Sequence, residues 1–198
     1  MTDHRDDQGA KLGMWLFLFT ELLLFGMLFV VYAVYRSMHP EAFRIGGEEL
    51  DVVMGTINTV ILLISSMTMA MSITAIQKGD KKRCLQLLSV TLFIAIVFLV
   101  NKYFEWDTKF EYGFYPGSET LHDLGFGTIL FFGLYFFMTG LHALHILIGI
   151  GLFIYVISQV NKEHIHQTDY IWLENTGLYW HLVDLIWIFL FPLFYLIH

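Results

Sequence analysis

Charged residues and cysteine are both scarce in this chain. Only 15% of its 198 residues are Asp, Glu, Lys or Arg, whereas 57% are hydrophobic. This composition is too apolar for an ordinary soluble domain. The single cysteine, Cys84, has no partner for an internal disulfide and no metal-ligand spacing. The net charge of −7 argues against a nucleic-acid partner, for which a basic patch is expected.

Most of the few charges cluster in short segments between long apolar runs. Residues 52–76 and 124–160 contain no Asp, Glu, Lys or Arg. A helix needs roughly 20 apolar residues to cross the hydrocarbon core of a bilayer, and the alternation typical of membrane barrel strands is absent. The sequence therefore predicts an all-α, polytopic membrane helix bundle with five transmembrane helices.

We expect one membrane domain, residues 1–198, whose short polar connections leave no room for a soluble catalytic domain. Its predicted parts are a polar tail over residues 1–11 and spans at approximately 12–37, 52–77, 84–106, 124–160 and 176–197. The N-terminal sequence MTDHRDDQGAK lacks the basic region and cleavage site of a secretory signal, so the first apolar run is expected to be a retained helix.

The distribution of Lys and Arg predicts the orientation, because cytoplasmic loops carry an excess of these residues. With the N-terminus inside, the inner segments hold seven of them: Arg5, Lys11, Lys78, Lys81, Lys82, Arg83 and Lys162. The outer side then holds four: Arg36, Arg44, Lys102 and Lys109. We predict that the N-terminus lies inside and the C-terminus outside.

Several ionisable residues lie within the apolar spans. They are Glu21 in the first span, His142 and His145 in the fourth, and His181 and Asp184 in the fifth. Such residues are costly at bilayer depth and usually face protein or a polar cavity. Each pair in the fourth and fifth spans has a spacing of three, which places both side chains on one helix face. A further carboxylate, Glu105, ends the third span close to the predicted outer interface.

Three interpretations of this set compete. The favoured one is a buried polar network in which carboxylates and histidines pair through charge-assisted hydrogen bonds and fix the helix packing. A zinc or iron site is the second, but an HxxH pair without HExxH or a further histidine box is a weak signal, and haem ligation lacks partners on facing helices. Proton conduction through Glu21 and the histidines is the third.

Five sequence strings occur in a characteristic order: KLGMWLFLFTELLLF, NTVILLISS, KYFEW, TGLHALHILIG and YWHLVDLIWIFLFPLFY. Together they resemble the cytochrome c oxidase subunit III family of haem–copper oxidases, from Lys11 to Tyr195. Mitochondrial-type members have seven spans, whereas this chain resembles the shorter, five-helix bacterial form. The mitochondrial-type pattern has a Gln three residues before the Glu of a Glu-Tyr pair. Lys102 stands at that Gln position here, and Trp106 replaces the Tyr.

The resemblance implies an accessory subunit that itself holds no haem, no copper and no other metal, and has no catalytic residue. The redox centres would belong to oxidase subunits I and II. This chain would pack on subunit I, hold structural phospholipid between its helices, help dioxygen reach the partner's active site and sustain proton uptake. Position by position, Glu21, His142, His145, His181, Asp184 and Glu105 match family positions that are not redox ligands.

We therefore expect a non-catalytic subunit of a proton-translocating terminal oxidase, in the inner membrane of a bacterium that respires aerobically. The electron donor would be cytochrome c or quinol, and other respiratory-complex subunits are possible partners. One alternative is an accessory subunit of a nitric oxide reductase. Another, from a different class, is a stand-alone proton channel or transporter.

Overall fold

The computed structural model describes residues 7–196, which form seven helices. Five long helices are apolar enough to cross a membrane. They are α1 (Asp7–Met38), α3 (Val52–Gln77), α4 (Lys81–Glu111), α6 (Phe126–Asn161) and α7 (Ile171–Tyr195). Two short helices, α2 (Pro40–Glu48) and α5 (Glu119–Leu124), lie in the connections. The predicted all-α bundle with five membrane-spanning helices is confirmed.

Parts of two predicted segments fall outside this description. Residues 1–6 of the predicted polar tail, including Arg5, and residue 197 of the last predicted span lie outside the described residues. Residues 7–11 of that tail already belong to α1. The predicted third span ends at residue 106, whereas α4 continues to Glu111. Neither α2 nor α5 was predicted.

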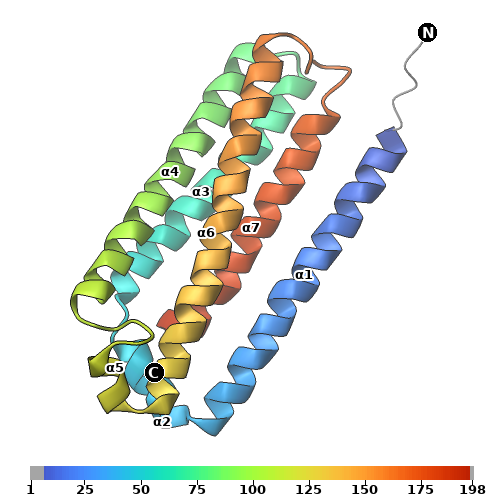
Figure 1. The fold of residues 1–198 in the computed structure, drawn as a ribbon. Helices are drawn as coiled ribbons and strands as arrows, with labels where there is room; N and C mark the ends of the chain where they lie inside the picture. Colours follow the sequence, from blue (N-terminus) through green and yellow to red (C-terminus); the bar gives the residue numbers. More distant parts are fainter. Residues whose placement is uncertain (1–6, 197–198) are drawn as a thin grey trace.

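Helices α3, α4, α6 and α7 form the core of the bundle, and α1 lies along one side of it (Figure 1). Among the described residues α1 packs only against α7, α6 and α2. In the most apolar stretch of α1 only 11% of residues are buried inside the protein, against 56% in α7. The helix α7 is therefore central, whereas α1 is peripheral and exposes most of its apolar surface.

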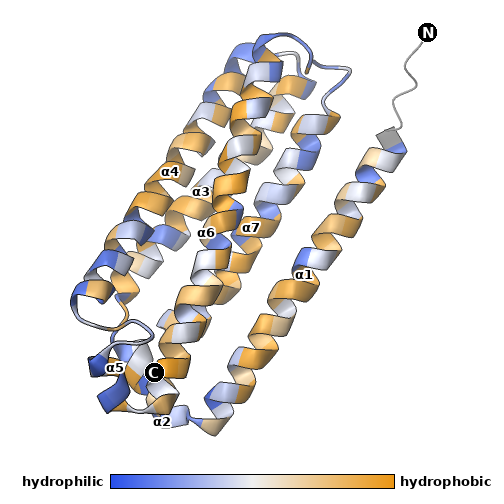
Figure 2. Ribbon diagram, viewed as in Figure 1, coloured by the Kyte–Doolittle hydropathy of each residue, from blue (hydrophilic) through white to orange (hydrophobic). Residues whose placement is uncertain are grey.

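The long helices alternate in direction, so the connections collect at two ends (Figure 1). Loops 78–80 and 162–170 lie at the end where α1 begins, which we call the N-terminal end. The opposite, C-terminal end carries α2 and α5. Hydrophobic residues predominate along the middle of the long helices, and polar residues predominate in the connections (Figure 2). This distribution fits a membrane-spanning bundle that has an apolar central region and two water-exposed ends.

Side chains in the connections fix where the helices begin. The Asp51 carboxylate accepts hydrogen bonds from the backbone N–H groups of Val53 and Met54, at 2.9 and 3.1 Å, and so caps α3. Asp80 caps α4 in the same way through Arg83 N–H at 2.9 Å. Such caps satisfy backbone donors that have no partner within the helix. The tight turn before α4 uses Gly79, whose φ of 78° favours glycine.

An ion pair closes the N-terminal end of the bundle. Lys81 Nζ lies 3.0 Å from Glu163 Oε1 and also donates to the Asn161 carbonyl oxygen at 3.0 Å. The adjacent Lys81 ammonium lowers the pKa of the Glu163 carboxyl below its ordinary value. This contact joins the start of α4 to the end of α6.

Close helix packing depends on particular glycines of α6 and α7. A Cβ atom at Gly149 would lie 2.8 Å from the Trp180 ring, and one at Gly177 would lie 2.7 Å from Ile73 Cδ1. The Trp180 ring is fully buried, and its Nε1–H donates to Ser65 Oγ at 3.0 Å. By contrast, a Cβ atom at Gly151 would have no neighbour within 4 Å. Small residues therefore permit close approach at specific positions and not along all of α6.

Gly149→Ala is expected to destabilise the protein by about 1–3 kcal/mol, because the added methyl group overpacks a site beside a ring that is held in place. Gly151→Ala, two residues away on the same helix, is the matched control and is expected to have little effect. Unfolding by SDS in mixed micelles would measure both free energies. Equal losses in the two variants would contradict the packing argument.

Candidate functional site

Glu21 and His145 form a hydrogen-bonded pair that joins α1 to α6. The distance from His145 Nε2 to Glu21 Oε2 is 2.9 Å, and the two side chains are only 8% and 14% exposed. His145 Nδ1 lies 2.7 Å from the Leu141 carbonyl oxygen. A carbonyl oxygen only accepts hydrogen bonds, so Nδ1 must carry a hydrogen and Nε2 must face the carboxyl group. The hydrogen bond between Nε2 and the Glu21 carboxyl group therefore links α1 directly to α6.

Two aromatic residues support this pair. The Phe25 ring meets the His145 imidazole edge to face, with ring centroids 5.4 Å apart. The Tyr179 hydroxyl donates to the His145 backbone carbonyl at 2.8 Å. Tyr179 belongs to α7, so three helices meet at this point. The contacts restrict the orientation of the imidazole.

The other three residues of the predicted network do not join this pair. The His142 ring stacks on the Trp187 ring at 5.2 Å, and neither ring nitrogen has a hydrogen-bond partner within residues 7–196. His181 Nδ1 is 2.7 Å from Ser66 Oγ on α3. Asp184 is 3% exposed, and neither of its carboxylate oxygens has a hydrogen-bond partner in the same part of the chain. The structure thus brings together only Glu21 and His145.

The described residues offer no obvious place for a metal ion. Within residues 7–196 there is no group of three or more His, Cys, Asp and Glu side chains placed to share one. Cys84 is buried at the start of α4 and is not part of any such group.

A second polar cluster lies toward the C-terminal end and centres on an ion pair. Lys102 Nζ is 3.1 Å from Glu105 Oε2, and both side chains are 4% exposed. The Lys102 ammonium also donates to the hydroxyl oxygens of Tyr195 and Tyr135, at 2.7 and 3.2 Å. Both tyrosine hydroxyls donate to Glu105 Oε1, that of Tyr135 at 2.5 Å. We call these four residues the lysine cluster.

The lysine cluster holds together α4, α6 and α7. Each of the two carboxylate oxygens of Glu105 has at least one donor, and the Lys102 ammonium lies 5.1 Å from the centroid of the Trp187 ring. A buried ion pair is tolerated when hydrogen bonds satisfy its remaining polar atoms, and a ring face adds a favourable cation–π contact. The hydrogen bonds of the cluster are made among its own four residues, and the side chains of its ion pair are buried.

Sequence reasoning found Glu105 but missed its partners. Lys102 was counted with the outer cations, whereas it is only 3% exposed inside the bundle. The spacing of three residues between Lys102 and Glu105 was the available signal, because it places both on one helix face. Tyr135 and Tyr195 come from helices distant in the sequence and had no local signal.

Further side-chain hydrogen bonds connect α3 to its neighbours. Asn101 Nδ2 donates to Asn58 Oδ1 at 3.0 Å, and Trp187 Nε1–H donates to Thr59 Oγ1 at 3.0 Å. Polar side chains in membrane bundles commonly bond across helices in this way. Both predicted motif regions, NTVILLISS and YWHLVDLIW, therefore contribute to the packing of α3.

The family model described as cytochrome c oxidase subunit III matches residues 3–198. The chain belongs to this family. The resemblance drawn from the five sequence strings is confirmed.

Relatives in several kinds of oxidase cover nearly all of the chain. It is 34% identical to cytochrome c oxidase subunit 3 of Thermostichus vulcanus, over 98% of the chain and 90% of the relative. It is 27% identical to cytochrome bo(3) ubiquinol oxidase subunit 3 of Pseudomonas aeruginosa, over 98% of the chain and 88% of the relative. A third relative, haem–copper oxidase subunit I+III of Aeropyrum pernix, is 30% identical over 93% of the chain and 22% of its own length. These relatives give no support to the nitric oxide reductase alternative.

Removing the cation of the lysine cluster should be costly. Lys102→Met leaves the Glu105 carboxylate buried without its counter-ion, so we expect a loss of about 3–5 kcal/mol in the free energy of unfolding. In the double variant Lys102→Met/Glu105→Gln the unpaired charge is gone, and part of the stability should return. SDS-driven unfolding would measure this. A double variant as unstable as the single one would contradict the charge-pairing account.

Proposed function

We propose that the chain is the accessory subunit III of a bacterial haem–copper terminal oxidase. That complex would reduce dioxygen to water with electrons from cytochrome c or quinol and couple the reaction to proton translocation. The observation that carries the proposal is the family match over residues 3–198. The named relatives include a cytochrome c oxidase subunit and a ubiquinol oxidase subunit, so both classes of electron donor remain in the proposal.

Subunit I is the proposed direct partner. The Aeropyrum relative is named as subunit I+III, which supports an association between two such parts in an oxidase. Helices α3 and α4 of this chain expose large apolar side chains, including Val60, Phe93, Ile96 and Phe104. In a membrane such surfaces face either lipid or another helical subunit. Subunit II and other respiratory subunits would complete the assembly.

The proposed physical role is that of a scaffold in the bacterial inner membrane, with the N-terminus inside. Redox centres would belong to the partner subunits, and this chain would contribute packing and lipid. Two crevices beside α1 support the lipid part. One, of about 340 Å³, is lined by residues that include Met14, Phe17 and Leu152. The other, of about 200 Å³, includes Leu22, Phe29 and Phe189. Their apolar walls suit acyl chains and would also admit dioxygen.

Gentle detergent extraction of the native membrane should recover this chain with a haem- and copper-bearing partner. The measurement is identification of the co-purified chains together with a visible absorption spectrum. The chain purified alone should show no absorption band in the visible range. A bound transition metal or a haem absorption band in the isolated chain would contradict the scaffold proposal.

Removing either member of the Glu21–His145 pair should weaken the packing of α1 against the bundle without lowering the haem content of the complex. We expect Glu21→Ala and His145→Ala to weaken the docking of α1 by about 1.5–3 kcal/mol, the usual worth of a hydrogen bond to a charged group. The subunit should then dissociate more readily, or the complex should lose activity after fewer turnovers. Subunit ratio, haem content and the number of turnovers before inactivation measure this.

Thr20→Ala is the matched control, because Thr20 is exposed on α1 and its hydroxyl bonds only to the Phe17 carbonyl of its own helix among the described contacts. It should leave all three quantities unchanged. Loss of haem from an otherwise assembled complex carrying either pair variant would refute the proposed role.

A further inference from the structure

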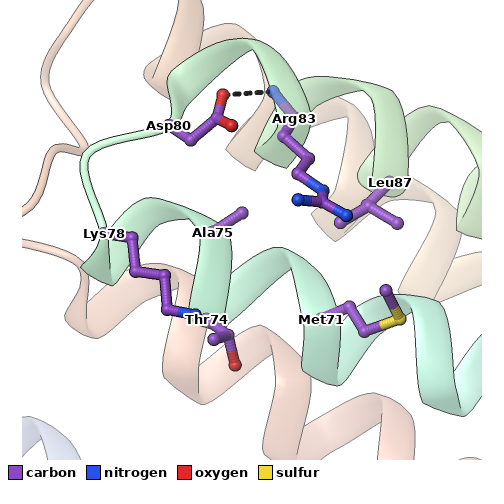
Figure 3. Close-up of a pocket in the computed structure, with 7 residues that line it drawn as sticks. All are labelled: Met71, Thr74, Ala75, Lys78, Asp80, Arg83 and Leu87. Atoms are coloured by element: carbon purple, nitrogen blue, oxygen red, sulfur yellow. Dashed lines mark hydrogen bonds between the residues drawn. The ribbon is translucent and has the colours of Figure 1, made fainter.

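A cavity of about 420 Å³ opens between α3 and α4 beside the loop at the N-terminal end (Figure 3). It shares no residue with the Glu21–His145 pair or with the lysine cluster, whose Lys102 lies further along α4 toward the C-terminal end. Its lining residues are Met71, Thr74, Ala75, Lys78, Asp80, Arg83 and Leu87. The cavity therefore combines two cations and one carboxylate with an apolar wall.

Neither cation forms an ion pair in the described part of the chain, and the Asp80 carboxylate is the one anionic group among the lining residues. Lys78 and Arg83 are both exposed, and no ion pair or side-chain hydrogen bond involves either of them within residues 7–196. The carboxylate of Asp80 instead caps α4 by accepting from the backbone N–H of Arg83. In Figure 3 the Arg83 side chain extends from α4 toward α3, while Lys78 lies back along α3 beside Thr74. An anion reached by both flexible side chains would interact favourably with each charge.

The apolar residues of the cavity lie deeper along α3 and α4 than its two cations. Met71 precedes Lys78 by two helical turns, or roughly 10 Å along α3, and Leu87 follows Arg83 by one turn. An exposed apolar stripe continues deeper along the same face of α3 at helical spacing: Val60, Ile64, Met67 and Met71. The surface is therefore cationic at the end of the helices and apolar below it, in the order of a phospholipid's headgroup and acyl chains.

We propose that this cavity binds one anionic phospholipid, with its phosphate between Lys78 and Arg83 and an acyl chain along the α3 stripe. Basic pockets between transmembrane helices at a membrane interface suit anionic headgroups, and the stems of Lys and Arg can lie on apolar surface while their charges reach the phosphate. An acidic segment of a partner subunit would use the two cations but not the apolar stripe. The site uses the proposed function only for the membrane environment and is separate from the crevices beside α1.

The test uses the intact complex that contains this chain, reconstituted in nanodiscs of phosphatidylcholine and phosphatidylglycerol. Native mass spectrometry would count the retained lipids and give the preference for phosphatidylglycerol over phosphatidylcholine. We expect Lys78→Gln or Arg83→Gln to lower this preference at the site about 5-fold each and the double variant about 30-fold, from the usual contribution of one cation near a membrane surface. Lys78→Arg should retain it.

Lys82→Gln is the matched control, because Lys82 is an exposed cation of the same loop that does not line the cavity. The proposal is overturned if the double variant keeps the same lipid preference as this control. It is also overturned if the double variant loses a partner subunit while its lipid count stays unchanged, since the cations would then bind protein. Haem content and subunit I recovery, measured on the same samples, report separately on the oxidase assignment.

Discussion

Hydrocarbon supplies no hydrogen-bond partners. An ionisable side chain inside this bundle is therefore most stable when a group on another helix completes its hydrogen bonds. Glu21 of α1 meets His145 of α6. Lys102 and Glu105 lie on the same helix, and the tyrosines that complete their hydrogen bonds come from α6 and α7. In both places a polar contact can form only when particular helices are in register. Apolar packing alone would tolerate sliding, whereas these contacts specify one arrangement.

The two clusters differ in what they can do. The Glu21–His145 pair is a single side-chain hydrogen bond between two groups that are 14% and 8% exposed. The lysine cluster contains a full ion pair with a hydrogen bond to each carboxylate oxygen and a ring against the ammonium. Where the mitochondrial-type family pattern has a neutral Gln, this chain has a cation, and Glu105 then balances its charge. The first cluster joins a peripheral helix to the core, and the second joins three core helices to one another.

Sequence patterns predicted the features that depend on local composition. Long apolar runs sufficed for the five spans, since span length is set by bilayer thickness. Pairing of carboxylates with histidines was predicted for a network of five residues, and the structure places Glu21 against His145. His142 was expected in the same network, yet it stacks on Trp187, a contact set by helix rotation that spacing does not determine. The partners of Lys102 were missed because Tyr135 and Tyr195 meet it only through tertiary packing.

The weak attachment of α1 gives the Glu21–His145 pair its importance. This helix buries little of its apolar surface, and in hydrocarbon that surface gains nothing from leaving lipid for protein. Its docking must therefore rest on close packing and on polar contacts such as this pair. Two apolar crevices, both lined by α1 and α7 and one of them also by α6, reduce the direct packing further. A lipid chain in either crevice would restore those contacts, so lipid occupancy and the polar pair would stabilise the same helix together.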